Sequence, residues 1–209
     1  MGRPSDARGR LIEAAISLFW RQGFSGVSVD QICEAASVRK GSFYHFFESK
    51  EELALAALEA HWLRRRPMLD EVLRSEAPPL ERLGRYFLFI RERQYELARE
   101  HGRVLGCFYF SLGIGNVELP RVNACVREII AVYEGYYTKL LTEAGQAGFL
   151  RLRDPAEKAR SLFRFIEGML ADARLHDSLE GIEHLPRLAF EFLGIEVPLT
   201  PDQELRVPA

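Results

Sequence analysis

The chain has 209 residues, 47% hydrophobic and 28% charged, a composition that is normal for a soluble globular protein of one or two domains. Its formal net charge of −2 excludes a uniformly basic nucleic-acid-binding protein, although residues 1–50 carry seven Lys or Arg against five Asp or Glu. Three cysteines without a CxxC motif argue against a disulfide framework or a zinc site and favour a reducing compartment.

The N-terminal residues are polar and basic and do not resemble a signal peptide. The longest uncharged run, residues 104–117, is too short to cross a bilayer. We therefore expect a cytoplasmic protein without a membrane segment.

The first predicted helix follows a short N-terminal arm. Residues 1–6 are interpreted either as a basic arm, in which Arg3 reaches a minor groove or phosphates, or as a disordered start. The helix is predicted from Ser5 or Asp6 to about residue 22, and Gly23 fits the position just after a helix end. Its inner stripe is expected to contain Leu11, Ala15, Leu18 and Phe19.

Residues 28–50 carry the pattern of two short helices joined by a tight turn, followed by the start of a third. Ser28 with Gln31, and Ser49 with Glu52, fit capping boxes, in which two side chains satisfy the first backbone N–H groups of a helix. Residues 40–47 combine small, basic and aromatic side chains, and such a helix fits the DNA major groove. The outward side chains are expected to be Lys40, Ser42, Tyr44 and His45, and the inward ones Val38, Phe43 and Phe47.

This region resembles the N-terminal DNA-binding domain of the TetR family of bacterial transcription regulators. The resemblance rests on SVDQI at residues 28–32, AASV at 35–38, KGSFYHFF at 40–47 and SKEEL at 49–53, and it extends back through residues 2–4 and 11–24. One departure is Phe46, which stands where the family usually has a Tyr or His that contacts phosphate. The resemblance implies binding to double-stranded operator DNA, with Tyr44 and His45 at base edges and Ser28 and Lys50 at phosphates. The expected DNA-binding residues are Ser28, Arg39, Lys40, Gly41, Ser42, Tyr44, His45 and Lys50.

The rest of the pattern predicts further helices and no strand. A long helix is expected from residue 50 to residue 66, where Pro67 kinks or ends it. Helices follow over residues 80–100, 104–117 and 120–144, Asp154 with Pro155 marks the start of another, and the last spans about 182–193. The fold class is therefore predicted to be all-α with about nine helices and a loose tail over residues 196–209.

Two domains and a dimer are expected. Residues 1–50 form the helix-turn-helix DNA-binding domain, linked by the helix at 50–66 to an effector-binding and dimerisation domain at 51–195. The last two helices are more apolar than one helix pair needs, and two copies would bury that surface as a four-helix bundle between subunits. A two-fold homodimer also places two recognition helices one DNA turn apart, as a palindromic operator requires.

No catalytic pattern that would indicate an enzyme is present, because the five histidines are scattered and no HExxH, GxSxG or phosphate-loop motif occurs. No cofactor and no metal site are expected. The C-terminal part instead mixes many aromatic residues with polar ones, which is typical of a small-molecule pocket, although each aromatic residue alone fits an ordinary core. The candidate ligand-binding residues are Phe89, Arg93, Cys107, Tyr109, Asn116, Tyr133, Tyr137, Phe163, Glu167 and Arg174. An arginine that faces such a pocket would favour an effector with a carboxylate.

Cys107 supports an alternative form of regulation. Residues 105–107, with LP at 119–120 and EGM at 167–169, resemble the C-terminal domain of a TetR branch whose members respond to small electrophiles and unsaturated acids. A thiol near a helix start can be more ionised than usual, so Cys107 is a candidate sensor or else an inert buried cysteine. The other two cysteines lie on apolar helix faces and are interpreted as core.

The leading hypothesis is a homodimeric transcriptional repressor that a small-molecule effector releases from a palindromic operator. One alternative is a thiol-based sensor of electrophiles or oxidants through Cys107. Another, from a different class, is a helical enzyme or an interaction module that lacks DNA binding.

Overall fold

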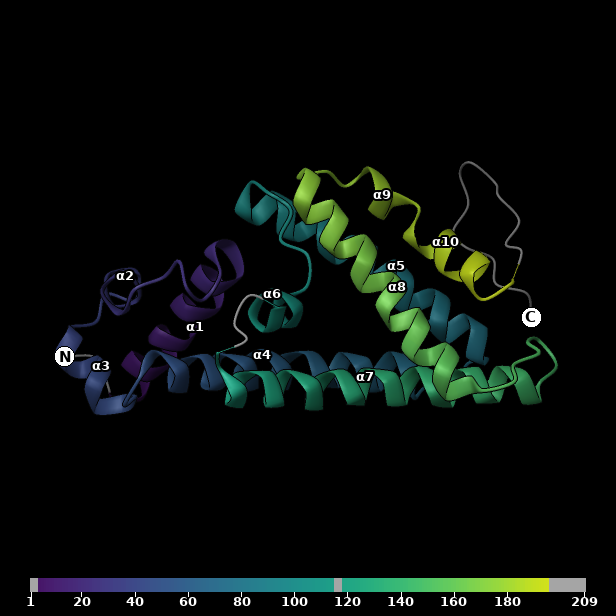
Figure 1. Cartoon of the computed structure of the whole chain (residues 1–209), viewed down its shortest axis with the longest axis horizontal. Coiled ribbons are helices and arrows are strands. Elements are labelled where there is room, and N and C mark those ends of the chain that lie inside the picture. The colour runs from purple at the N-terminus through teal and green to yellow at the C-terminus, as the bar shows by residue number, and fades with distance from the viewer. Residues whose placement is uncertain (1–3, 115–117, 196–209) are drawn as a thin grey trace. The chain divides into compact units, whose positions relative to one another are not determined.

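The computed structural model describes residues 4–114 and 118–195, and within these ranges it contains ten helices and no strand (Figure 1). The predicted all-α fold class is confirmed, with one helix more than expected. The helices are α1 (Pro4–Gln22), α2 (Val29–Ala35), α3 (Lys40–Phe46), α4 (Lys50–Leu73), α5 (Pro79–His101), α6 (Phe108–Ile114), α7 (Pro120–Gln146), α8 (Pro155–His176), α9 (Glu180–Glu183) and α10 (Leu185–Phe192). The expected tail at residues 196–209, the beginning of the expected arm and Asn116 lie outside the described residues.

The chain divides into two compact units. Unit 1 comprises the described residues up to Arg66 together with those of 108–129, and unit 2 comprises residues 67–107 and the described residues from 130 onward. Helices α4 and α7 each contribute residues to both units. The segment that contains α6 thus groups with the helix-turn-helix region and not with the residues that precede it.

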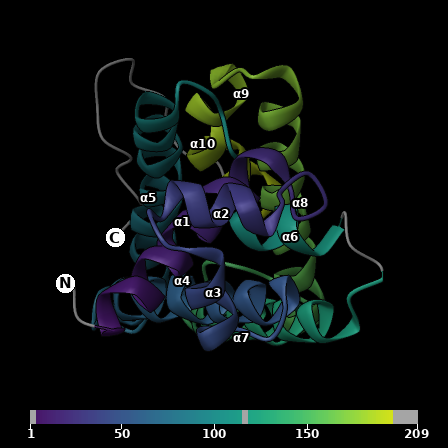
Figure 2. The same ribbon diagram turned by 90° about the vertical axis from the view of Figure 1, so that its left-hand side faces the viewer.

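Unit 1 is built on α1, which contacts α2, α3 and α6 (Figure 2). Its apolar stripe is buried at Leu11, Ala15 and Phe19, as the helical spacing predicts. Leu18, which was expected on the same stripe, is half-buried. Phe43 of α3 is fully buried, so the apolar face of the third helix is anchored in the core of this unit.

Unit 2 is held by packing among α5, α8, α9 and α10. Phe87 of α5 and Phe190 of α10 are both fully buried, and their ring centroids are 5.3 Å apart in an edge-to-face arrangement. Burial of one such aromatic side chain contributes roughly 1.5–3 kcal/mol, and the edge-to-face pairing adds about 0.5–1.5 kcal/mol. Leu162 of α8 is also fully buried in this unit.

Local capping signals are confirmed at the helix starts. Ser28 Oγ accepts a hydrogen bond from the Gln31 backbone N–H at 3.2 Å, and Gln31 Oε1 accepts one from the Ser28 N–H at 2.7 Å. Asp154 Oδ1 accepts from the backbone N–H groups of residues 156 and 157 at 2.9 and 3.0 Å. At Ser49 the hydroxyl caps Glu52 as predicted, at 3.1 Å, but the Glu52 carboxylate accepts from the Glu48 N–H instead of the Ser49 N–H.

Three predicted helix boundaries differ from the structure. Helix α4 continues through Pro67 to Leu73, so the proline removes one backbone hydrogen bond without ending the helix. Residues 104–107 are not helical, and α6 begins only at Phe108, because Gly106 takes a left-handed conformation with φ of 65°. The last predicted helix is split into α9 and α10 at His184, since Pro186 follows in the first turn of α10 and has no N–H to donate.

Candidate functional site

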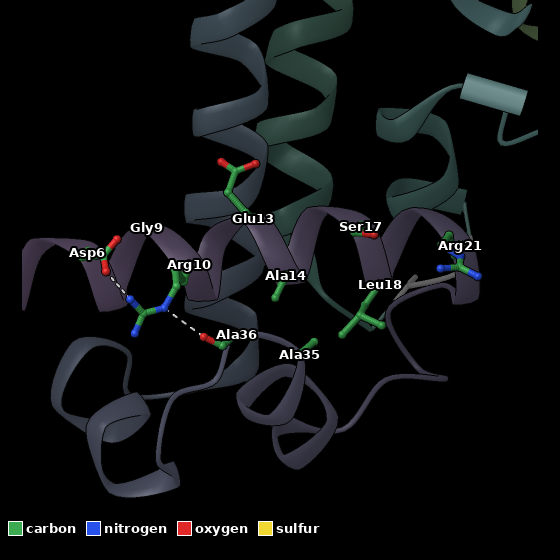
Figure 3. A pocket seen from close by; sticks show the side chains of 10 residues that line it. All are labelled: Asp6, Gly9, Arg10, Glu13, Ala14, Ser17, Leu18, Arg21, Ala35 and Ala36. Atoms are coloured by element: carbon green, nitrogen blue, oxygen red, sulfur yellow. Dashed lines mark hydrogen bonds and ion pairs between the residues drawn. The ribbon is translucent and has the colours of Figure 1, made fainter. Parts of the chain in front are cut away.

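The turn between α2 and α3 is fixed by backbone bonds and by one side chain from α1. Ser37 has a left-handed φ of 52°, and the next N–H, of Val38, donates to the Cys33 carbonyl at 2.9 Å. Arg10 of α1 donates through Nε to the Ala36 carbonyl at 2.9 Å and also pairs with Asp6 (Figure 3). Arg10 therefore caps the carbonyl end of α2 and fixes α2 against α1, a role that the sequence analysis did not predict.

A groove of about 620 Å³ lies between α1 and the end of α2. Small side chains line it, including Ala14 and Ala35, and Leu18 points into it from α1 (Figure 3). Of its charged side chains, Arg10 pairs with Asp6, and Glu13 pairs with Arg64 at 2.8 Å. The groove thus has the character of a packed helix–helix junction.

Helix α3 presents its polar residues to solvent. Tyr44 is 55% exposed, and its ring meets Phe43 edge-on with centroids 5.1 Å apart, so the buried phenylalanine supports the exposed tyrosine. His45 is also exposed. Of the other expected DNA-binding residues, Ser28, Arg39, Lys40 and Gly41 are exposed and Ser42 is half-buried. One helix face therefore offers an aromatic hydroxyl, an imidazole and an amine together.

Lys40 is paired within the protein. Its Nζ lies 2.8 Å from Asp30 Oδ1, and the hydrogen bond to Asp30 raises the pKa of the lysine. Both side chains are exposed, so the pair joins the starts of α2 and α3 at the surface. An exposed pair of this kind contributes little to stability and exchanges readily for a phosphate partner.

Lys50 makes contacts within the protein that the sequence analysis did not predict. Its Nζ donates to the carbonyls of Phe24 and Val27 at 2.9 and 2.7 Å and lies 4.1 Å from the centre of the Phe24 ring. Burial lowers the pKa of this lysine. Two of the three ammonium donors therefore hold the connection between α1 and α2, and one remains for the expected phosphate contact.

Replacement of Lys50 by methionine is expected to lower the free energy of unfolding by about 1–3 kcal/mol, because two carbonyls lose their charged donor. Operator affinity should fall as well. Urea unfolding and operator titration at several salt concentrations measure the two effects, with Lys139→Met as the control for an exposed lysine. A variant that keeps its stability and only flattens the salt dependence by about one unit per site would show that Lys50 is a phosphate contact alone.

A cluster of buried polar side chains lies in unit 2. Glu167 of α8 is only 6% exposed, it accepts a hydrogen bond from the Cys107 thiol, and its Oε2 has no hydrogen-bond partner. Burial raises the pKa of Glu167 to about 7, and the bond from Cys107 opposes that rise. Next to this pair, the hydroxyls of Tyr86 (α5) and Tyr137 (α7) bond to each other, and burial raises the pKa of both phenols well above the ordinary value.

Side chains of α5, of α8 and of the residue that ends α8 bond four successive residues of the segment that precedes α6. Asp177 Oδ1 accepts from the residue 104 N–H at 2.7 Å, and Arg174 donates to the residue 105 carbonyl at 3.0 Å. Gln94 donates to the Gly106 carbonyl at 3.4 Å, and Cys107 bonds Glu167. A Cβ on Gly106 would lie 3.0 Å from a carbonyl of α8, so the close approach itself requires glycine.

The other expected ligand-binding residues are only partly brought together. The Tyr133 ring lies 6.1 Å from Phe163, and the Phe89 ring stacks with Tyr86 at 6.4 Å, which places all of these near the cluster. Arg93 instead pairs with two acids of its own helix, at 3.0 and 3.6 Å. Tyr109 belongs to unit 1, where its hydroxyl lies 2.9 Å from His61 Nδ1.

Two members of this network were missed by the sequence analysis. Gln94 is 5% exposed, and its Oε1 has no partner, although its spacing from Tyr86 and Ile90 would have placed it on the buried stripe of α5. Asp177 is the C-cap of α8 with φ of 49°, and no sequence signal indicated it. Within residues 4–114 and 118–195, no three His, Cys, Asp or Glu side chains form a potential metal site. No helix in these ranges is long and apolar enough to span a membrane.

Comparisons with known proteins agree with this architecture. Residues 11–57 match the family of bacterial regulatory proteins described as the tetR family. The transcriptional regulator AcuR of Cereibacter sphaeroides is 34% identical over 183 residues, which cover 83% of this chain and 82% of AcuR. The HTH-type transcriptional repressor NemR of Escherichia coli is 27% identical over 190 residues, which cover 86% of this chain and 89% of NemR.

Solved structures give the same result. The regulatory protein TetR from Rhodobacter sphaeroides has a TM-score of 0.79 and 31% identity, with 89% of this chain and 98% of that chain covered. The reduced form of E. coli NemR has a TM-score of 0.76 and 24% identity, with 95% and 100% covered. The chain therefore belongs to the TetR family, and it is a DNA-binding transcriptional regulator.

Proposed function

We propose that the protein is a cytoplasmic, homodimeric repressor that leaves a palindromic operator when a small molecule binds in unit 2. The observation that carries this proposal is the cluster of Cys107, Glu167 and Gln94, in which two buried oxygen acceptors lack a partner. A buried polar atom without a partner costs free energy, and a perturbed carboxyl in such a place is typical of a functional site. The cluster is therefore the candidate polar end of the effector site.

The position of the cluster along the chain supports a link to DNA binding. Residues 104–107 are bonded in unit 2, and the next two residues, Phe108 and Tyr109, pack in unit 1. There the Phe108 ring lies 5.5 Å from Trp20 of α1, and Tyr109 bonds His61 of α4. A ligand that breaks one of the bonds to residues 104–107 would change how α6 packs on α1 and α4. It shifts the equilibrium only by its differential affinity for the two arrangements.

The test is release of operator DNA. DNA upstream of the protein's own gene is bound in a fluorescence anisotropy assay, and small carboxylates and uncharged aromatic compounds are added. We expect Glu167→Gln to change the concentration of active compound needed for release. Glu157→Gln is the control, because Glu157 lies at an exposed position of the same helix. If no Glu167→Gln titration differs from that of the unaltered protein, the effector binds elsewhere.

A second candidate function is thiol sensing, which the contact between Cys107 and Glu167 favours. Cys107 is a free cysteine that is only partly buried. A solved structure of E. coli NemR, to which this chain is similar, is of the reduced form. Loss of operator release in Cys107→Ser would favour sensing through the thiol, and an unchanged response would favour reversible ligand binding.

Dimerisation is proposed through α8 and α10. The half-exposed rings of Phe165 and Phe192 stack with centroids 4.8 Å apart, and Leu188, one helical turn before Phe192, is half-exposed as well. Lys158 also contacts the Phe192 ring, with Nζ 4.1 Å from its centre. This apolar face is the surface that a second copy of the chain would bury.

Replacement of Phe192 by aspartate is expected to give monomers or insoluble protein, because it places an unpaired charge in the proposed interface. Light scattering after size-exclusion chromatography measures the mass. Leu63→Asp is the control, since Leu63 is 60% exposed on α4, outside the proposed interface, and its replacement should leave the mass unchanged. A soluble and dimeric Phe192→Asp protein would mean that the subunits meet elsewhere.

A further inference from the structure

The buried Glu167 carboxylate bonds Cys107 and leaves one of its oxygens without a hydrogen-bond partner, which packing alone does not explain. One carboxylate oxygen accepts from the thiol, and the other, Oε2, is buried without a partner. The carboxyl is carried by α8. Arg174 of the same helix bonds the residue 105 carbonyl, two positions before the thiol, so α8 positions both groups. Cys107 is only partly buried whereas Glu167 is 6% exposed, so the proton acceptor is better shielded from water than the residue that carries the thiol.

We propose that Glu167 is the general base for covalent modification of Cys107 by carbon electrophiles. The inference rests on the second candidate function, thiol sensing, and specifies its chemistry. The S–H bond breaks as its proton passes to Glu167, and the sulfur forms a bond to the electrophilic carbon. With an alkyl halide, the carbon–halogen bond breaks and halide leaves with the electron pair. With an activated alkene, the electron pair moves to the neighbouring carbon, which takes the proton back from Glu167.

The surroundings fit a proton acceptor that works near neutral pH. A thiol reacts as its thiolate, and an ordinary cysteine is mostly protonated at pH 7. Burial raises the pKa of Glu167 to about 7, which makes it a stronger base than an ordinary carboxylate while it is still ionised in part of the molecules. This match between base strength and working pH is what general-base catalysis requires.

The neighbouring titratable groups come from each element around the carboxyl. Tyr86 on α5 and Tyr137 on α7 face it with neutral hydroxyls, because burial raises the pKa of both phenols. Arg174, further along α8, is bonded to the residue 105 carbonyl. On α10, which packs against α8, Arg187 and Glu191 pair with each other at 2.7 Å. The proton of Cys107 therefore has Glu167 as its hydrogen-bonded acceptor.

The test measures alkylation of Cys107 in the full-length protein without DNA. Iodoacetamide is the probe, and peptide mass spectrometry follows the rate at residue 107 between about pH 5.5 and 9.5. The unaltered protein is expected to show a rise centred near the pKa of Glu167, about 7, followed by a plateau. In Glu167→Gln the rate at pH 7 should fall by about tenfold or more, and the remaining rate should rise only as the thiol itself ionises. Glu157→Gln, at an exposed position of the same helix, should keep the original profile.

Two outcomes for Glu167→Gln would contradict the proposal. If the carboxylate only suppresses the thiolate by repulsion, Glu167→Gln will react faster at every pH, and the proposal is wrong. An unchanged profile would also overturn it. Should Glu167→Gln fail to fold, the unaltered protein still decides the question: a solvent deuterium isotope effect no larger than that of free cysteine would exclude proton transfer to Glu167. Operator release is measured separately, so alkylation through Glu167 without release would refute thiol sensing and leave this chemistry intact.

Discussion

Replacement of Tyr44 by alanine is expected to weaken operator binding by about 30-fold or more while the protein stays folded and dimeric. A good base contact contributes roughly 1–3 kcal/mol, and a dimer on a palindromic site loses it in both halves. At least about 2 kcal/mol is then lost, which corresponds to the stated change in affinity. Tyr44 is 55% exposed, so its removal leaves no cavity in the core. Fluorescence anisotropy at fixed salt measures the affinity, and circular dichroism measures the fold.

Two further variants separate the contribution of the Tyr44 hydroxyl from the effect of removing any exposed side chain. Tyr44→Phe keeps the edge-on contact with the Phe43 ring and removes only the hydroxyl, so its loss of affinity reports the hydrogen bond. Leu175→Ala removes an exposed side chain of unit 2 and should bind the operator normally. A folded Tyr44→Ala protein with unchanged operator affinity would remove Tyr44 from the recognition surface.

The helix starts could be predicted because their signals are local. The Ser28 capping box and the Asp154 cap each involve residues within three positions of one another, and both form as expected. The burial of Phe43 beside the exposed Tyr44 likewise follows from helical spacing within one short segment. These elements depend on neighbouring residues alone, and their pattern is visible in the sequence.

Other parts of the site depend on residues far apart in the chain. Lys50 bonds carbonyls 26 and 23 positions away, and Arg10 caps a carbonyl 26 positions away, so no local pattern reveals either role. The conformation of residues 104–107 is fixed by Gln94, Glu167 and Asp177, the last of them 73 positions from its partner. An uncharged run therefore suggested a helix over these residues, where long-range bonds instead hold a non-helical segment.

The second large expected effect is a pH dependence of the free energy of unfolding, which arises from Glu167. Its pKa is about 7 in the folded protein against an ordinary value of 4.5, so the folded state binds more protons than the unfolded state between these values. Stability from this group is therefore fully present below pH 4.5 and is lost as the pH rises through 7. The shift corresponds to about 3 kcal/mol, because each pKa unit is worth about 1.4 kcal/mol.

Glu167→Gln should remove this dependence, since the amide does not ionise. We expect the variant to be more stable than the unaltered protein at pH 8, and the difference to shrink steadily toward pH 5. Urea unfolding at one protein concentration measures both proteins at each pH, which keeps any contribution of dimerisation constant. Other ionisable groups are common to both chains, so they cancel in the difference. Glu157→Gln supplies the matched control at an exposed position of α8 and should follow the unaltered protein. A difference between Glu167→Gln and the unaltered protein that stays constant from pH 5 to pH 8 would mean that the buried carboxyl does not titrate in this range.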